Sequence, residues 1–450
     1  MHKMKMNNMM VVGVAALLLA VSIFLWTGCS DSSNPASTSS NTSSANTSSS
    51  VLTAYTQSGG TATKSNQTYS ATATDESAVH VTNAGILTLT NSTIITSGNT
   101  SSQENSSFYG LNAAVLAESA STINLSNSTI TTSGTGANGA FATGSGSLVT
   151  LSNVTIKATA DGGHGVMATQ GGELTLTDVD ITTSGGSSSA IATDRGSGTI
   201  TVTGGDVITS GQNSAGIYST GVITVSNGMF TATGAEAAVI EGANSITLTN
   251  TTLSSSKENK WGVMIYQSMP GDAEGTRGIF TMTGGSLAYT AASGPLFYVT
   301  NSTGVITLKG VNITAASWTL VNASAGNWGM SGSNGGTAIF TADGQTLTGN
   351  MVADNSSSIT ATLQNSSSLT GAINADNTAR TVNLTLDATS KWTVTANSYL
   401  TCLTDSSGIS GATITNIIGN GYTVYYDQNA CAALGGLTYS LVNGGELIPK

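Results

Sequence analysis

The chain has 450 residues, of which only 8% are charged, and its net charge is −11. Because nucleic-acid binding needs clustered Lys and Arg to neutralise phosphates, an acidic chain without a basic cluster argues against a nucleic-acid partner. Apolar residues make up 39% of the chain and alternate strictly with polar residues over long segments, which argues against disorder in most of the chain.

Residues 1–29 have the organisation of an export signal. Two lysines precede an apolar run from Val11 to Leu25, and the sequence Trp-Thr-Gly-Cys then ends at Cys29. This arrangement resembles a bacterial lipoprotein signal, which implies that Cys29 is lipidated and becomes the mature N-terminus. An uncleaved transmembrane anchor is the alternative, since about 20 apolar residues can cross a bilayer. Both alternatives imply export, and Ser30 after the cysteine favours a lipid anchor at the outer membrane or cell surface.

Residues 30–50 consist almost wholly of Ser, Thr, Asn and Ala. Such a composition cannot bury a core, so we expect a disordered tether here. A flexible segment of this length spans on the order of 25 Å, which is enough to hold a domain away from a lipid surface.

A short phrase of alternating apolar and Thr or Ser residues recurs nine times between Leu87 and Thr314. The second apolar residues of successive copies are separated by 36, 26, 25, 26, 23, 23, 34 and 26 residues. A repeat of this length is typical of solenoids, in which each repeat forms one turn. The nine positions are Leu89, Leu125, Leu151, Leu176, Val202, Val225, Leu248, Met282 and Leu308.

Each repeat reads as three short strands separated by turns rich in Gly, Asn and Ser. In the repeat from Gly165 to Gly185, alternation places Leu174, Leu176 and Ile181 inside and the intervening threonines outside. Most repeats are too short to contain a crossover helix, so successive turns must stack as parallel sheets. The sequence predicts no helix beyond the export signal.

From about Glu76 to Asn397 the chain resembles the right-handed parallel β-helix, or pectin-lyase-like, superfamily, and more particularly its Thr/Ser-rich bacterial adhesin-like members. The resemblance implies an all-β, single-stranded, right-handed β-solenoid, and counting the repeats gives roughly 13–14 turns. Because open ends of a solenoid would promote aggregation, we expect caps at both ends. Residues 51–398 are assigned to the β-helix with its N-terminal cap, from Val51 to Asp75, and residues 399–450 to the C-terminal cap.

Three cysteines occur in the chain. With Cys29 assigned to the lipid, Cys402 and Cys431 remain, both in the predicted C-terminal cap. An exported protein permits a disulfide between them, and two buried thiols are the alternative.

Two repeats are longer than the rest, with steps of 36 and 34 residues. Extra residues in a solenoid turn must loop outward, and such loops often carry binding residues, although tolerated insertions are the alternative. The candidate recognition residues in these two segments are Phe108, Tyr109, Tyr266, Asp272, Glu274 and Arg277.

An enzyme that acts on polysaccharides is the main alternative to a binding protein. Asp194 and Glu241 end equivalent strands two turns apart, about 10 Å from each other, and Arg195 follows Asp194. Gly163-His164-Gly165 resembles the Gly-His-Gly of polygalacturonases, but the companion motifs Asn-Thr-Asp, Asp-Asp and Arg-Ile-Lys are absent. We expect His164 to occupy a solvated, variable corner, because the aligned position holds Asn138, Ser189, Ala215, Ala237 and Trp261 in other turns.

The leading hypothesis is a surface-displayed, non-enzymatic β-helix protein that binds polysaccharide, a host or neighbouring cell surface, or matrix, and that contacts a membrane through its N-terminal lipid. The outward Thr columns also resemble ice-binding faces, but Asn124 and Lys309 interrupt them. A coat or filament subunit is a third hypothesis, which the predicted caps argue against. With three His in the chain, we expect no His-based metal site and no cofactor.

Overall fold

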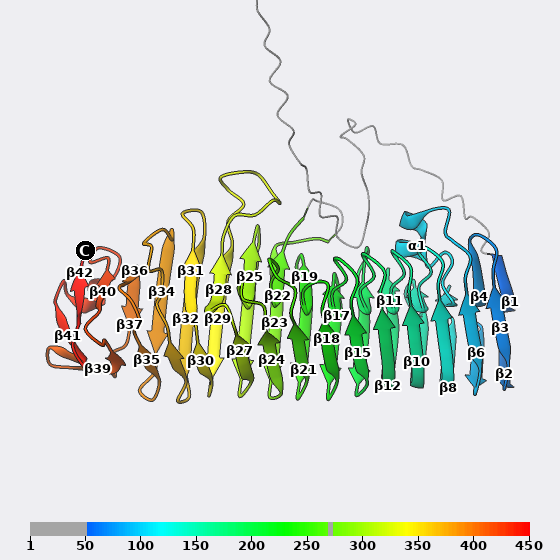
Figure 1. Cartoon of the computed structure of the whole chain (residues 1–450), viewed down its shortest axis with the longest axis horizontal. Coiled ribbons are helices and arrows are strands. Elements are labelled where there is room, and N and C mark those ends of the chain that lie inside the picture. Colours follow the sequence, from blue (N-terminus) through cyan, green and yellow to red (C-terminus); the bar gives the residue numbers. More distant parts are fainter. Residues whose placement is uncertain (1–51, 269–272) are drawn as a thin grey trace, which may run out of the picture.

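The computed structural model describes residues 52–268 and 273–450, and they form a parallel β-solenoid of about 16 turns. Figure 1 shows a rod with β1 at one end and the last strands at the other. At about 4.8 Å per turn the rod is on the order of 75 Å long. The solenoid predicted from the repeat is therefore confirmed, and it has more turns than the 13–14 expected.

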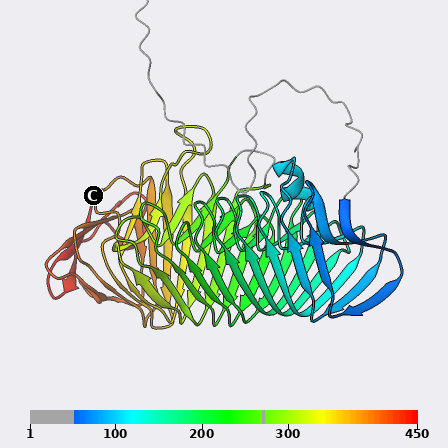
Figure 2. The ribbon, with the colours of Figure 1, turned by 45° about the vertical axis from the view of Figure 1, so that its right-hand side comes forward.

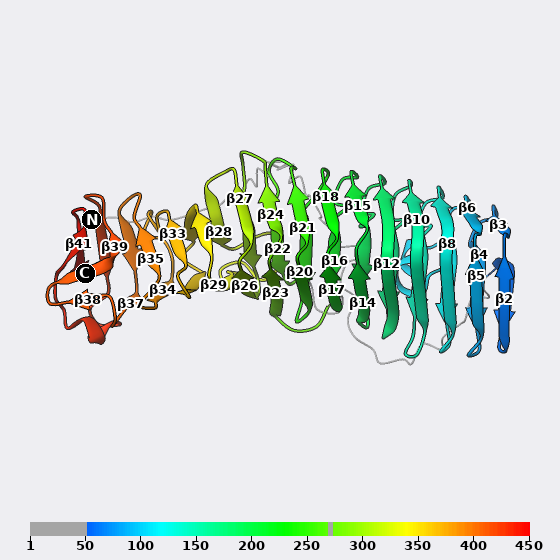
Figure 3. The same ribbon diagram turned by 90° about the horizontal axis from the view of Figure 1, so that it is seen from below.

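The turns build three sheets, here called A, B and C, which run along the rod (Figures 2 and 3). Most turns contribute one strand to sheet A and either two strands or one long strand to sheet B. Sheet A contains, in spatial order, β1 (Leu52–Ser58), β4 (Glu76–Thr82), β7 (Val115–Glu118), β9 (Ala140–Thr143), β11 (Val166–Thr169), β13 (Ile191–Thr193), β16 (Ile217–Ser219), β19 (Ala238–Glu241), β22 (Val263–Tyr266), β25 (Phe297–Thr300), β28 (Thr319–Ala323) and β31 (Asn350–Ala353).

Sheet B bends around a corner, which the long strands β8, β10 and β12 cross without interruption. Its strands are β2 (Thr61–Ser65), β3 (Thr68–Ala71), β5 (Ile86–Thr90), β6 (Thr93–Thr96), β8 (Thr122–Thr132), β10 (Leu148–Ala158), β12 (Gly172–Thr183), β14 (Gly198–Thr203), β15 (Asp206–Thr209), β17 (Val222–Ser226), β18 (Met229–Ala232), β20 (Ser245–Thr249), β21 (Thr252–Ser255), β23 (Arg277–Thr283), β24 (Ser286–Tyr289), β26 (Thr303–Lys309), β27 (Asn312–Ala315), β29 (Thr337–Asp343), β32 (Ser358–Gln364), β34 (Thr381–Leu386) and β37 (Cys402–Thr404).

Sheet C closes the C-terminal end of the rod. Its strands are β30 (Thr346–Thr348), β33 (Ser368–Thr370), β35 (Lys391–Thr393), β36 (Ser398–Leu400), β38 (Ile409–Ser410), β39 (Thr413–Ile418), β40 (Thr423–Tyr426), β41 (Tyr439–Val442) and β42 (Glu446–Pro449). Antiparallel pairs, β38 with β39 and β41 with β42, end the parallel stacking. A 3-10 helix, Ala432–Leu434, lies between β40 and β41.

The extra turns come from both ends of the chain. Residues 52–71, which were predicted to be part of an N-terminal cap, pair in register with the next turn and so form a turn themselves. At the other end, β36, β40 and β42 continue the parallel stacking within the predicted C-terminal cap. The repeat phrase is weak in both regions, which is why counting phrases gave too few turns.

The core is one continuous column of inward-facing side chains along the rod axis. In β12, Leu174, Leu176 and Ile181 are buried and the intervening threonines are exposed, as alternation predicts. Strict register carries this pattern from turn to turn, so Leu176 pairs with Leu151 on one side and Val202 on the other. The threonines of successive turns accordingly form columns on the outside of sheet B.

Candidate functional site

The outer surface of sheet A differs from that of sheet B because its outward positions are largely apolar. Eleven buried residues on or just before the strands from β7 to β25 form one apolar cluster on this face. Its buried members are Ala113, Leu116, Phe141, Met167, Ala192, Ala215, Tyr218, Val239, Met264, Tyr266 and Tyr298. Two partly exposed tryptophans, Trp261 and Trp328, pack against this buried cluster, and they mark the face as the candidate interaction surface.

The first long insertion folds over the N-terminal part of this face as helix α1 (Gln103–Tyr109), seen beside β4 and above β8 and β10 in Figure 1. Ser102 caps the helix by accepting a hydrogen bond from the backbone N of Asn105, and Gly110 ends it with a φ of 74°. The prediction that no helix follows the export signal was wrong, since Ser102 and Gly110 supply helix boundary signals that strand periodicity does not reveal.

The two aromatic residues of α1 have different roles. Phe108 is 1% exposed, and its carbonyl oxygen accepts a 2.8 Å hydrogen bond from the Thr169 hydroxyl, so its prediction as an exposed recognition residue was wrong. Tyr109 is 49% exposed, as a recognition residue would need to be. Burial of Phe108 docks the helix on sheet A.

Arg195 attaches the far side of α1 to the sheet. Its guanidinium carbon lies 3.9 Å from the centre of the Phe108 ring, and its Nη1 lies 3.4 Å from the Glu104 carboxylate. Arg195 thus joins a cation–π contact to an ion pair, both to α1. Arg195, which was proposed to accompany the carboxylate pair of Asp194 and Glu241, therefore holds α1 in place.

The second long insertion lies between β22 and β23. Tyr266, predicted to be in the loop, is the last residue of β22 and is fully buried, so it is not an exposed recognition residue. Glu274 and Arg277 are exposed, and Asp272 lies outside the described residues. The loop returns over sheet A, where the Gln267 side chain donates a 2.7 Å hydrogen bond to the carbonyl of Ala273.

Glu241 lies at the centre of a cluster of hydroxyl groups on this face. Its carboxylate accepts hydrogen bonds from the hydroxyls of Tyr218, Ser268 and Tyr266, the last at 2.8 Å. The residue is 1% exposed. Three hydroxyl donors satisfy the oxygen atoms of this buried carboxylate.

Two tryptophans border the Glu241 cluster and remain partly exposed. The Trp261 ring stacks on Tyr298 with a centroid distance of 4.5 Å, and the Trp328 ring lies 4.9 Å from that of Tyr266. Indole and phenol rings combine an apolar face with a polar group, so this arrangement can bind ligands that have both characters. Neither tryptophan was predicted as a site residue, because the two come from different turns and pack against one cluster only in the fold.

A second buried carboxylate, Glu236, lies beside this aromatic group. Its Oε1 is 3.4 Å from the Nζ of Lys260, which also lies 5.5 Å from the Trp261 ring centre. Burial raises the pKa of Glu236, and the Lys260 ammonium opposes that effect. The register pairs Ile217 with Ala238, so Glu236, and not Ala237, occupies the position equivalent to His164.

The proposed carboxylate pair, Asp194 and Glu241, occupies equivalent outward positions two turns apart, with Thr220 between them. Asp194 is 2% exposed, and its Oδ1 accepts a 2.7 Å hydrogen bond from the backbone N of Arg195. Both carboxylates are therefore on the predicted ridge, but neither is exposed.

His164 is completely buried, so the prediction of a solvated corner was wrong. Its backbone N donates a 2.9 Å hydrogen bond to the Asn138 side chain, and its Nδ1 lies 3.3 Å from the carbonyl oxygen of Ser189. Burial lowers the pKa of His164 to about 4. A neutral imidazole inside the turn stack supports a structural role.

Cys402 and Cys431 form a disulfide, which decides between the two alternatives left open by the sequence. Cys29 and the assigned signal and tether segments lie outside the described residues. Over residues 52–268 and 273–450, no group of His, Cys, Asp and Glu is placed to hold a metal ion. No helix in the described part of the chain is both long and apolar enough to span a membrane.

No protein-family model and no curated protein sequence matches this chain.

Proposed function

We propose that this chain is a surface-displayed, non-enzymatic β-helix protein that binds glycan through the outer face of sheet A. The observation that carries the proposal is the pair of partly exposed indoles, Trp261 and Trp328, which border the hydroxyl-bonded carboxylate of Glu241. Sugar rings present apolar C–H faces and polar hydroxyls, which fit aromatic rings and fixed polar groups. Helix α1 and the loop after β22 border this face at two points along the rod.

The cellular context of the proposal comes from the sequence. The N-terminal pattern ending at Cys29 supports lipid anchoring at an outer membrane or cell surface. The repeat supports membership of the pectin-lyase-like superfamily and its adhesin-like members. A rigid rod on a flexible tether would hold the binding face away from the membrane, where it can contact polysaccharide, another cell or matrix.

The test is to mix the purified protein with a panel of acidic and neutral polysaccharides and to measure binding as co-elution in size-exclusion chromatography. Replacing Trp261 or Trp328 by Ala is expected to weaken binding at least tenfold. Trp318→Ala is the matched control, because Trp318 is 53% exposed and lies in the turn before β28, not in the apolar cluster. Equal binding by all three variants, or no polymer bound at all, would refute the proposal.

A polysaccharide-cleaving enzyme is the second candidate, and the equivalent positions of Asp194 and Glu241 two turns apart favour it. Its weakness is that both carboxylates are buried and that Glu241 is already bonded to three hydroxyls. The same chromatography separates the two functions. Polymers that shorten with the native protein, but not with an Asp194→Asn, Glu241→Gln double variant, would establish the enzyme.

A further inference from the structure

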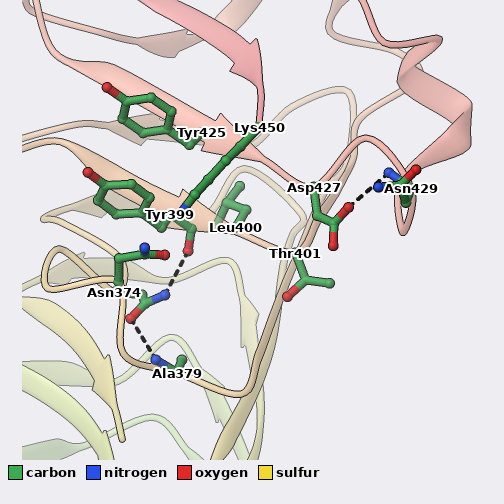
Figure 4. Close-up of a pocket in the computed structure, with 10 residues that line it drawn as sticks. Asn374, Ala379, Tyr399, Leu400, Thr401, Tyr425, Asp427, Asn429 and Lys450 are labelled. Carbon is green, nitrogen blue, oxygen red and sulfur yellow. Dashed lines mark hydrogen bonds between the residues drawn. The ribbon is translucent and has the colours of Figure 1, made fainter. Parts of the chain in front are cut away.

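A pocket of about 310 Å³ lies where the solenoid meets its C-terminal cap (Figure 4). Its strands β36 and β40 are far along the rod from β19, which ends at Glu241 (Figure 1). Its walls come from the segment before β34, from β36, from β40 with the loop that follows it, and from Lys450 after β42. This volume is at the lower end of the range for small-molecule sites, and one or two sugar rings fit such a space.

Two tyrosines form an aromatic wall of the pocket. Tyr399 and Tyr425 pair in register on neighbouring parallel strands, and their rings stack with centroids 4.6 Å apart and planes 6° apart. Both residues are only partly buried, so the stacked pair leaves aromatic surface accessible to a ligand. A wall of this kind suits the C–H face of a ring.

Lys450 places a positive charge at this wall. Its Nζ lies 5.1 Å from the Tyr399 ring centre, and its backbone N donates a 2.8 Å hydrogen bond to the carbonyl of Tyr426. None of the ion pairs formed among the described residues involves Lys450. The charged side chains that line the pocket are Lys450 and Asp427, so a carboxylate on the ligand is favoured at the Lys450 side, against Tyr399, and disfavoured at the Asp427 side.

Polar groups on the opposite side complete the pocket. Asp427 Oδ1 accepts hydrogen bonds from the backbone N of Asn429, at 2.8 Å, and of Ala430, at 3.2 Å, which fixes the loop. The exposed side chains of Asn377 and Asn429 offer amide donors and acceptors. On the lower wall in Figure 4, Asn374 donates a 3.1 Å hydrogen bond to the Tyr399 carbonyl.

The disulfide joins two walls of this pocket. Cys402 follows Thr401 on one wall, and Cys431 follows the Asp427–Ala430 loop on the other. The cross-link therefore holds the loop against the strand before any ligand arrives. Pre-organisation of this kind reduces the entropy lost on binding.

We propose that the pocket binds a carboxylated sugar, with the ring against Tyr399, the carboxylate beside Lys450, and the hydroxyls on Asn377, Asp427 and Asn429. This site is separate from the outer face of sheet A, and the proposal does not rest on the function proposed for that face.

Isothermal titration calorimetry with D-glucuronate and D-glucose tests this proposal, because the two sugars differ only in the carboxylate. The native protein is expected to bind glucuronate at least tenfold more tightly than glucose. Lys450→Gln is expected to abolish that preference. Lys391→Gln is the matched control, since Lys391 is an exposed lysine on β35, outside the pocket.

Two further variants test the aromatic wall and the polar side of the pocket. Tyr399→Ala removes the aromatic wall and is expected to weaken binding at least tenfold. Because this change also removes packing against Tyr425, Asn429→Ala at an exposed position serves as an independent test and should weaken binding severalfold. Trp261→Ala should leave glucuronate binding unchanged, which separates this pocket from the sheet A face. Absence of saturable binding by the native protein, equal affinity for the two sugars, or an unchanged Lys450→Gln variant would overturn the proposal.

Discussion

The Tyr266 hydroxyl donates a 2.8 Å hydrogen bond to the carboxylate of Glu241, and both residues are buried on the outside of the solenoid. They are neighbours in register on β19 and β22, 25 residues apart in the sequence. An outer face that buries a carboxylate among hydroxyls and aromatic rings is a specialised surface, since the outer face of sheet B is built from exposed threonines.

The first prediction concerns this hydrogen bond. Tyr266→Phe keeps the ring but removes one donor to a buried carboxylate, so we expect a loss of about 1.5–3 kcal/mol in the free energy of unfolding. Urea denaturation measures the change. Tyr109→Phe is the control, because that tyrosine is 49% exposed and its hydroxyl contributes little. Equal stability of the two variants would mean that Tyr266 does not stabilise the carboxylate.

The second prediction concerns the attachment of α1. Arg195→Gln removes the cation–π contact to Phe108 and the ion pair to Glu104. The amides of α1 should then exchange with deuterium several times faster, while those of β11 and β13 keep their rates. Arg380→Gln, which lies in the turn before β34, is the matched control. If α1 exchanges at the native rate in the Arg195 variant, the helix is held by Phe108 packing alone.

The third prediction concerns pH. Burial lowers the pKa of His164 from 6.5 to about 4, so the unfolded state binds a proton that the folded state excludes. The stability contributed by neutral His164 is complete above pH 6.5 and is lost as the pH falls towards 4. The loss amounts to about 3 kcal/mol.

Comparing the free energy of unfolding of the native protein and of His164→Asn between pH 7 and 4 isolates this effect. Other groups, such as Glu236, whose raised pKa acts in the opposite direction, titrate in both proteins and cancel. Asn also stands at the equivalent position of the previous turn, as Asn138, so the turn tolerates it. We expect a smaller decrease in stability for the variant; parallel pH curves would assign the acid sensitivity to other groups.

The fourth prediction concerns the disulfide between Cys402 and Cys431, which are 29 residues apart. Replacing both cysteines by Ser should destabilise the C-terminal end by about 3–4 kcal/mol, since the unfolded loop is no longer closed. Because each turn of a solenoid contacts mainly its neighbours, the loss should be local. Hydrogen exchange of the amides of β36, β40 and β42 follows this end, and the amides of β8 and β10 should keep their rates. The affinity for D-glucuronate should fall as well, and an unchanged affinity would show that the cross-link does not shape the pocket.

The candidate site could be predicted only in part. The insertions and the ridge of Asp194 and Glu241 were found from sequence, because irregular repeat lengths and equivalent strand ends are visible in a linear pattern. The roles of Phe108, Tyr266 and His164 were not, since a strand pattern does not show what covers an outward residue. Trp261 and Trp328 carry no sequence signal that joins them.

The sequence by itself determined the solenoid, the three strands per turn and the inward set of apolar residues. These features depend on alternation and on repeat length, which are local and survive without knowledge of neighbours. Only the tertiary structure decided which outward residues gather on one face, which of them α1 covers, and that Cys402 meets Cys431 at the edge of a pocket. Those relationships depend on the register between turns and on where insertions fold back. A shift of one residue in register changes them: alignment of the repeats placed Ala237 at the position equivalent to His164, whereas the structure places Glu236 there.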